Sequence, residues 1–107
     1  MISFFFYNKL TNIELLKNIN NNFKIYDGYI NIKNYNSENN FLEISDKSSN
    51  NKFLYGKIVD FNMNLYDIIK KINEIEECKL ENRKKYTLKT IWANNTFGGE
   101  YLTYIIY

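Results

Sequence analysis

The sequence contains no histidine and no proline, and it has a single cysteine, Cys78, and a single arginine, Arg83. The lack of histidine excludes Ser-His-Asp and Cys-His nucleophilic mechanisms and removes the commonest metal ligand. One cysteine cannot form an internal disulfide, which predicts a reducing, cytoplasmic compartment. Because the formal net charge is only +2 and its basic residues are scattered, no nucleic-acid partner is expected. Any chemistry in this chain falls to carboxylates.

The chain has 107 residues, of which 45% are hydrophobic and 18% aromatic. This length and composition predict a single domain over residues 1–107 with one small core. The apolar run at residues 2–7 has no basic flank and no small-residue cleavage site, so we expect neither a signal peptide nor a membrane span. We interpret this run as a strand.

Runs rich in β-branched and aromatic residues, with strand-like alternation in residues 23–32, predict strands over residues 2–7, 23–32, 41–44, 52–61, 86–93 and 101–107. Residues 34–40 and 45–51 are expected to be loops, and residues 94–99 the turn of a hairpin. One short helix is predicted from a capping box of Thr11 and Glu14 through about Asn18, and a second begins after Asn64, with Asp67 three residues on. This order of elements, without repeats, favours an α+β fold.

One carboxylate breaks the pattern of the second helix. On a helical wheel the apolar residues Leu65, Ile68, Ile69, Ile72 and Ile75 span an arc of roughly 120°. Glu76 falls inside this arc, whereas Glu74 and Glu77 lie outside it. An inward carboxylate near a helix C-terminus favours its protonated form, which predicts a raised pKa and a general acid/base role. The alternative is that the helix ends near Ile75 and that the three glutamates form a solvated acidic run.

Several short patterns follow one another along the chain. They are Phe4-Phe5-Phe6-Tyr7-Asn8-Lys9-Leu10, Tyr26-Asp27-Gly28-Tyr29, Gly56-Lys57-Ile58-Val59, Ile72-Asn73-Glu74-Ile75-Glu76-Glu77 and Asn82-Arg83-Lys84-Lys85. In this order they resemble the motifs of the γ-glutamylcyclotransferase-like family, over nearly the whole chain. That family has a Y-G-[ST]-L loop, a glycine-bearing strand, a G-x-[VIL]-[VY] strand, an L-D-x-x-E-G helix and a Y-x-R segment. Tyr7 and Leu10 match the loop motif, while Asn8 and Lys9 replace its glycine and small hydroxyl residue.

The resemblance implies a small mixed β-barrel-like sheet flanked by two helices, with a pocket where the first loop meets the glutamate-bearing helix. It implies that Glu76 is the catalytic residue and that Tyr7, Asn8, Lys9 and Leu10 bind the substrate's carboxylate. The implied reaction releases 5-oxoproline from a small-molecule γ-glutamyl substrate, with neither a metal nor an organic cofactor. No membrane partner is expected, and no protein partner is identified.

Other interpretations stay open. Because Asn8 and Lys9 depart from the motif, the chain could be a catalytically inactive member of the fold that acts as a small-molecule or protein binding module. A third hypothesis is a tyrosine-rich partner-binding domain of other ancestry, although core packing is the preferred explanation for most of the tyrosines. Cys78 is a poor candidate nucleophile because no histidine can activate it and Glu77 opposes the thiolate.

Overall fold

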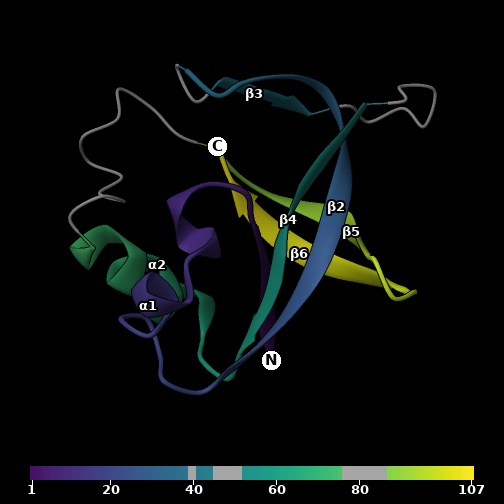
Figure 1. Ribbon diagram of the computed structural model, residues 1–107. Helices are drawn as coiled ribbons and strands as arrows, with labels where there is room; N and C mark the ends of the chain where they lie inside the picture. The colour runs from purple at the N-terminus through teal and green to yellow at the C-terminus, as the bar shows by residue number, and fades with distance from the viewer. Residues whose placement is uncertain (39–40, 45–51, 76–86) are drawn as a thin grey trace.

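The computed structural model describes residues 1–38, 41–44, 52–75 and 87–107 (Figure 1). In chain order its elements are β1 (Ile2–Phe6), the 3-10 helix η1 (Lys9–Thr11), α1 (Ile13–Leu16), β2 (Phe23–Asn36), β3 (Phe41–Ile44), β4 (Lys52–Phe61), α2 (Leu65–Glu74), β5 (Leu88–Asn95) and β6 (Glu100–Ile106). The strands expected at residues 41–44 and 52–61 have these bounds in the structure. The expected alternation of strands and helices is therefore confirmed in the described residues.

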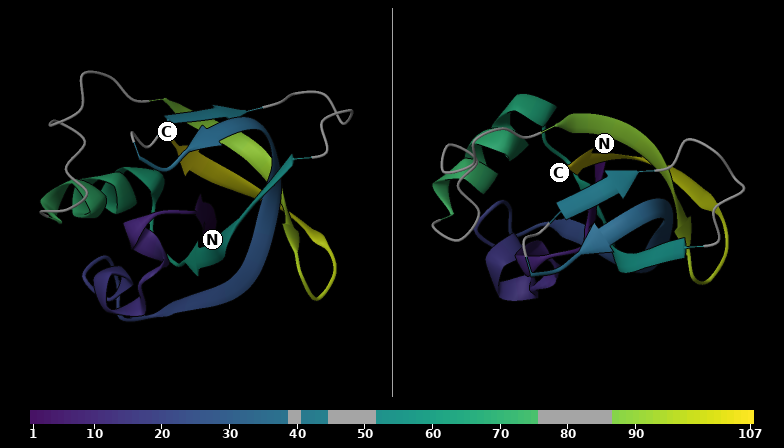
Figure 2. Two further views of the ribbon diagram at one scale, coloured as in Figure 1. Left: turned by 45° about the horizontal axis from the view of Figure 1, so that its top comes forward. Right: turned by 90° about the horizontal axis from the view of Figure 1, so that it is seen from above.

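The strands form one sheet that closes on itself. Their order is β3-β2-β4-β1-β6-β5, and an additional pairing of β2 with β5 joins the two sides of the sheet. β1 is antiparallel to β4 but parallel to β6, so the sheet is mixed. The five strands β2, β4, β1, β6 and β5 make a small barrel, and β3 extends from the long strand β2 across one end of it (Figure 2). The predicted mixed, barrel-like sheet with two helices is thus confirmed as a small α+β domain.

Alternate residues of each strand face two separate cores, because successive side chains in a strand point to opposite faces. Phe5, Ile30, Ile58 and Ile105 are fully or almost fully buried inside the barrel. The other core lies between the outside of the barrel and the helices, and its buried members are Phe4, Phe6, Leu10, Leu16, Ile19, Val59, Phe61, Ile68, Ile72 and Ile75. Both helices consequently cover one side of the barrel (Figures 1 and 2).

Two glycines allow the strands to approach closely where the barrel closes. Gly28 and Gly56 are paired across β2 and β4, and Gly28 is also paired with Asn95 of β5. A Cβ at Gly56 would lie 2.2 Å from the carbonyl oxygen of Phe6, and one at Gly28 would lie 2.9 Å from that of Asn94. Neither separation fits a side chain, so glycine at both positions is a steric requirement of this sheet.

Local capping explains where the helices begin. The Asn64 side chain accepts a hydrogen bond from the Asp67 N–H at 2.8 Å and donates one to its carboxylate at 2.9 Å, as the sequence predicts. The first helix differs from the prediction. Asn12, and not Thr11, caps α1 by accepting from the Glu14 N–H at 2.8 Å, because the Thr11 hydroxyl instead donates to the Asn8 carbonyl at 2.9 Å.

Several other expected boundaries shift. β2 continues through residues 34–36, which were expected to form a loop, because Asn34, Tyr35 and Asn36 pair with β3. The first helix ends at Leu16, two residues before the expected end, and β5 runs to Asn95. The hairpin turn is confirmed, with Gly98 and Gly99 at φ values of 116° and 93° that favour glycine. Among the described residues, no helix is long and apolar enough to cross a membrane.

Candidate functional site

The segment predicted to bind substrate begins directly after β1, at one end of the barrel. Tyr7 follows the last residue of β1, and its ring stacks on Phe5 at 6.5 Å between centroids. The same ring meets Tyr35 edge-on at 5.6 Å, and its hydroxyl donates to the Ile106 carbonyl at 3.5 Å. Tyr7 is therefore held by β1, β2 and β6 at the rim of the barrel core.

Asn8, Lys9 and Leu10 form a tight turn whose polar groups are partly used within it. The Asn8 side chain accepts from the Leu10 N–H at 3.3 Å, and the Asn8 carbonyl accepts from the Thr11 N–H at 3.0 Å. Asn8 has a negative φ of −122°, so this turn does not need the left-handed conformation that glycine permits. Lys9 is exposed, whereas Leu10 is buried in the core beneath the helices.

The helix that precedes Glu76 ends earlier than the wheel assumes. α2 ends at Glu74, and Ile75 has an extended backbone with φ −78° and ψ 122°. Helical periodicity therefore cannot place residue 76, and the wheel argument for an inward Glu76 is not supported. Glu76 itself lies outside the described residues, as do Glu77, Cys78 and Arg83, so the role given to Glu76 stays a prediction.

The described end of α2 nevertheless packs in the same core as the loop. Ile75 and Leu10 are 7% and 5% exposed, and both belong to the cluster between the helices and the barrel. Glu74 is exposed and forms an ion pair with Lys71 at 3.5 Å, which confirms its expected position off the apolar stripe. The residue directly before Glu76 is therefore anchored in the same core as Leu10.

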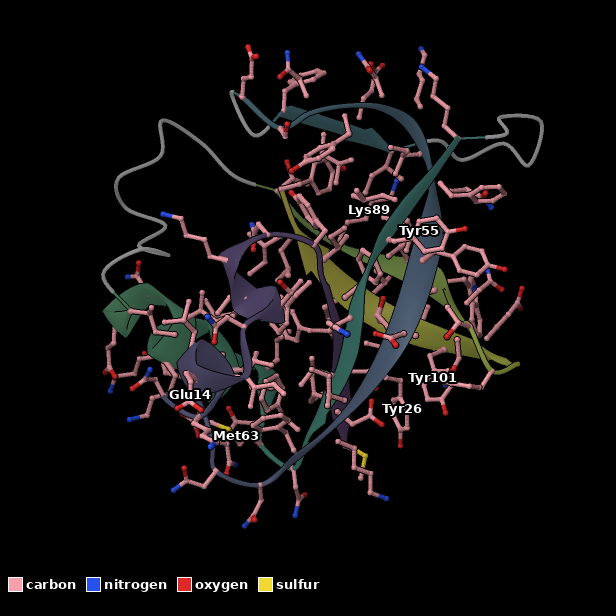
Figure 3. All side chains as sticks on the ribbon, viewed as in Figure 1. Glu14, Tyr26, Tyr55, Met63, Lys89 and Tyr101 are labelled. Carbon is pink, nitrogen blue, oxygen red and sulfur yellow. The ribbon has the colours of Figure 1, made fainter. Side chains whose placement is uncertain are left out.

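Two inward-facing residues at this end of the barrel are not among the predicted site residues. Lys89 is paired with Ile105, whose side chain is inside the barrel, and Lys89 is itself half-buried. Figure 3 shows Lys89 toward the end of the barrel that β3 crosses. Tyr35, which contacts Tyr7, was placed in a loop. The sequence carries a signal for Lys89, because alternate residues of a strand share a face and Lys89 shares its face with the apolar residues Ile91 and Ala93.

Not every tyrosine is explained by core packing. Tyr29 contacts both Phe53 and Tyr55, with ring centroids 5.4 Å apart in each pair, on the outer face of β2 and β4. Tyr55 is 65% exposed and Phe53 48% exposed.

In the described residues no group of three or more His, Cys, Asp or Glu side chains is arranged to hold a metal ion. The candidate site therefore has aromatic, amide and lysine groups, with Glu76 as its predicted carboxylate.

Comparison with known proteins gives no relative, since no family model, no curated protein and no solved structure matches this chain. The family resemblance consequently depends on the motifs in the sequence alone.

Proposed function

We propose that this chain is a γ-glutamylcyclotransferase-like enzyme that releases 5-oxoproline from γ-glutamyl amines or peptides. The observation that supports this most directly is the shared core of Leu10 and Ile75, which anchors both the loop after β1 and the residue before Glu76. The barrel with two helices on one side is compatible with the fold that the motifs imply. Tyr7 adds an aromatic wall where this loop leaves the barrel.

In the proposed reaction Glu76 acts first as a base and then as an acid. It removes a proton from the α-amine of the γ-glutamyl group, whose nitrogen attacks the γ-carbonyl carbon and closes the five-membered ring. The bond between that carbon and the departing amine then breaks, and Glu76 returns the proton to the leaving nitrogen. One C–N bond forms and one breaks, so no oxidant, reductant or water is consumed.

The substrate's carboxylate is bound by the loop of Tyr7, Asn8, Lys9 and Leu10 in this proposal. Lys9 is exposed and supplies the positive charge. The Leu10 N–H already donates to Asn8, so the amide group of Asn8 takes part in recognition in place of a free backbone N–H. Leu10 serves as the buried anchor that fixes the turn.

The test uses Glu76→Gln and the matched control Glu74→Gln, because Glu74 is an exposed carboxylate at the end of α2. Both variants and the wild type are incubated with γ-glutamyl amino acids and γ-glutamyl amines, and 5-oxoproline is measured by chromatography. We expect release by the wild type and by Glu74→Gln, and a loss of at least about 100-fold in Glu76→Gln. Equal rates in all three proteins would show that Glu76 is not the catalytic group.

A second candidate function is a binding module of the same fold without catalysis. The hydrogen bond from the Leu10 N–H to the Asn8 side chain favours it, because this bond occupies an amide that an anion-binding loop would offer to its ligand. This candidate predicts saturable binding of a γ-glutamyl compound with no release of 5-oxoproline. Calorimetric titration that detects neither binding nor turnover with any γ-glutamyl compound would reject both functions.

A further inference from the structure

Polar and aromatic side chains gather at the barrel end opposite the Tyr7 loop. Because alternate residues face inward, the inward positions there are Ser3, Lys24, Tyr26, Asp60, Tyr101 and Thr103. They come from the starts of β1, β2 and β6 and the end of β4. We call this set the Asp60 end. Tyr7, the residue after β1, is four residues from Ser3, or about 13 Å of extended chain, so the Asp60 end is distinct from the site proposed above.

Asp60 is a buried carboxylate on the inward face of β4. It is 8% exposed, and its Oδ1 accepts a hydrogen bond from the Ser3 hydroxyl. Lys24 is paired with Asp60 across β2 and β4, yet within the part of the chain that the structure describes these two side chains form no ion pair. The Ser3 hydroxyl meets part of the hydrogen-bonding capacity of this buried carboxylate, and a cation that reached it would stabilise its charge further.

Two aromatic rings lie at the same end. Tyr26 and Tyr101 contact each other with centroids 5.6 Å apart and planes at 43°. Figure 3 shows them side by side, away from Lys89 at the other end of the barrel. The Thr103 hydroxyl donates to the Ile91 carbonyl at 2.9 Å, which ties β6 to β5 next to the pair. Tyr26 lies two residues along β2 from Lys24, the partner of Asp60, and so on the same inward face as the carboxylate. Tyrosine rings and a carboxylate on one face are a combination that attracts organic cations.

We propose that the Asp60 end binds the primary ammonium group of an alkylamine. A primary ammonium has three N–H donors, which the Asp60 carboxylate and the Ser3 oxygen accept. Its positive charge and adjacent methylene groups lie against the rings of Tyr26 and Tyr101. An anionic ligand is disfavoured by the Asp60 charge, and a quaternary ammonium lacks the N–H groups that these oxygens accept. This binding does not depend on the cyclotransferase proposal.

The experiment is a titration of the ¹⁵N-labelled protein with n-butylammonium chloride, followed by amide chemical shifts at constant ionic strength. n-Butanol, which is neutral and similar in shape, is the ligand control. We expect saturable shifts at Ser3, Asp60 and Tyr101 with the ammonium and none with the alcohol. Equal shifts with both ligands, a lack of saturation, or equally tight binding of tetramethylammonium would overturn the proposal.

Variants locate the binding group. Asp60→Asn keeps an oxygen that can accept from Ser3 but removes the charge, and it should weaken binding by at least about tenfold. Asp27→Asn is the matched control, because Asp27 is an aspartate on the outer face of β2 that is paired with Lys57. It should bind like the wild type, and a loss equal to that of Asp60→Asn would refute the assignment. Should Asp60→Asn fail to fold, Tyr101→Leu provides the second variant, and unchanged binding in it would contradict the proposed ring contact.

Discussion

The steric role of Gly56 leads to a sharp prediction for the variant Gly56→Ala. The added Cβ would lie 2.2 Å from the Phe6 carbonyl oxygen and 2.9 Å from Cζ of Phe5. A carbonyl in a paired strand cannot rotate away as a side chain can. β1 must therefore move away from β4, although five residues of β1 are paired with β4. The substitution thus opposes the pairing of the first strand.

The size of the effect follows from these distances. An unstrained carbon–oxygen contact is about 3.3 Å, so the two backbones must separate by roughly 1 Å. Overpacking in a core costs about 1–3 kcal/mol, and here the distorted strand pairing adds to that cost. We expect the free energy of unfolding to fall by at least about 3 kcal/mol. For a domain of this size, this corresponds to a decrease in Tm of about 12–24 °C.

Urea and thermal unfolding followed by circular dichroism would measure this change. Two other glycine-to-alanine variants calibrate it. At Gly28 the closest obstacle is the end of the Ile58 side chain at 2.7 Å, so Gly28→Ala should cost less than Gly56→Ala. At Gly98 the added Cβ meets no atom within 4 Å and the φ of 116° is the only strain, so Gly98→Ala should cost about 1–2 kcal/mol.

A double variant tests which atom is responsible. Phe5→Leu removes the ring that approaches the new Cβ but leaves the Phe6 carbonyl in place. It should therefore not restore the stability that Gly56→Ala loses. Recovery of stability in the double variant would show that the ring, and not the backbone, is the obstacle. A Gly56→Ala protein within 1 kcal/mol of the wild type would refute the steric reasoning as a whole.

Three further changes test capping, packing and surface charge by the same unfolding measurements. Asn64→Ala removes the acceptor for the Asp67 N–H and should lower the free energy of unfolding by about 1 kcal/mol. The control Asn62→Ala, at an exposed residue outside the helix, should lower it much less. Equal losses of stability in the two variants would contradict the capping role. Leu16→Ala should lower the free energy of unfolding by about 2–5 kcal/mol, because Leu16 is 0% exposed. Leu102→Ala, at a residue that is 54% exposed, should lower it by less than about 1 kcal/mol. The reverse order would show that the core is misplaced. Lys71→Met breaks the exposed ion pair with Glu74 and should change stability by less than about 1 kcal/mol; a larger, salt-sensitive loss would show that this pair matters more than its exposure indicates.

Elements with local signals could be predicted from the sequence. The start of α2 is determined by Asn64 and Asp67, which are three residues apart, and both hydrogen bonds of this cap form within one turn. The β5–β6 hairpin likewise depends on a local turn, in which the Gly98 N–H donates to the Asn95 carbonyl at 2.9 Å. These features need no information about distant parts of the chain.

The predictions from the sequence are wrong where the local structure depends on a pairing partner far along the chain or on a competing hydrogen bond. Residues 34–36 lie in a segment whose polar residues predict a loop, but β3 supplies a pairing partner that keeps them extended. Thr11 has the spacing of a helix N-cap, but its hydroxyl donates a hydrogen bond to the Asn8 carbonyl instead. Closure of the barrel through Gly28 and Asn95 is also non-local and has no signature in either strand alone.

The candidate site could be predicted only in part. That residues 7–10 follow the first strand could be predicted from the sequence, but the hydrogen bond from the Leu10 N–H to the Asn8 side chain depends on the turn that the backbone adopts. The wheel cannot place Glu76, because Ile75 leaves the helical conformation and helix ends are poorly defined by periodicity. Alternation puts Lys89 on the apolar face of its strand, but its position beside Ile105 at the end of the barrel depends on the pairing of β5 with β6.

The parallel pairing of β1 with β6 has a consequence for synthesis of the chain on the ribosome. Phe4 is paired with Tyr104, so β1 emerges 100 residues before its parallel neighbour β6 exists, although β4 on its other side is made earlier. At 5–20 residues per second this delay is roughly 5–20 s. During that time three consecutive phenylalanines, residues 4–6, lie on an uncovered strand edge of the kind that associates with other nascent chains. A chaperone that shields this edge until translation ends would therefore raise the yield of folded protein.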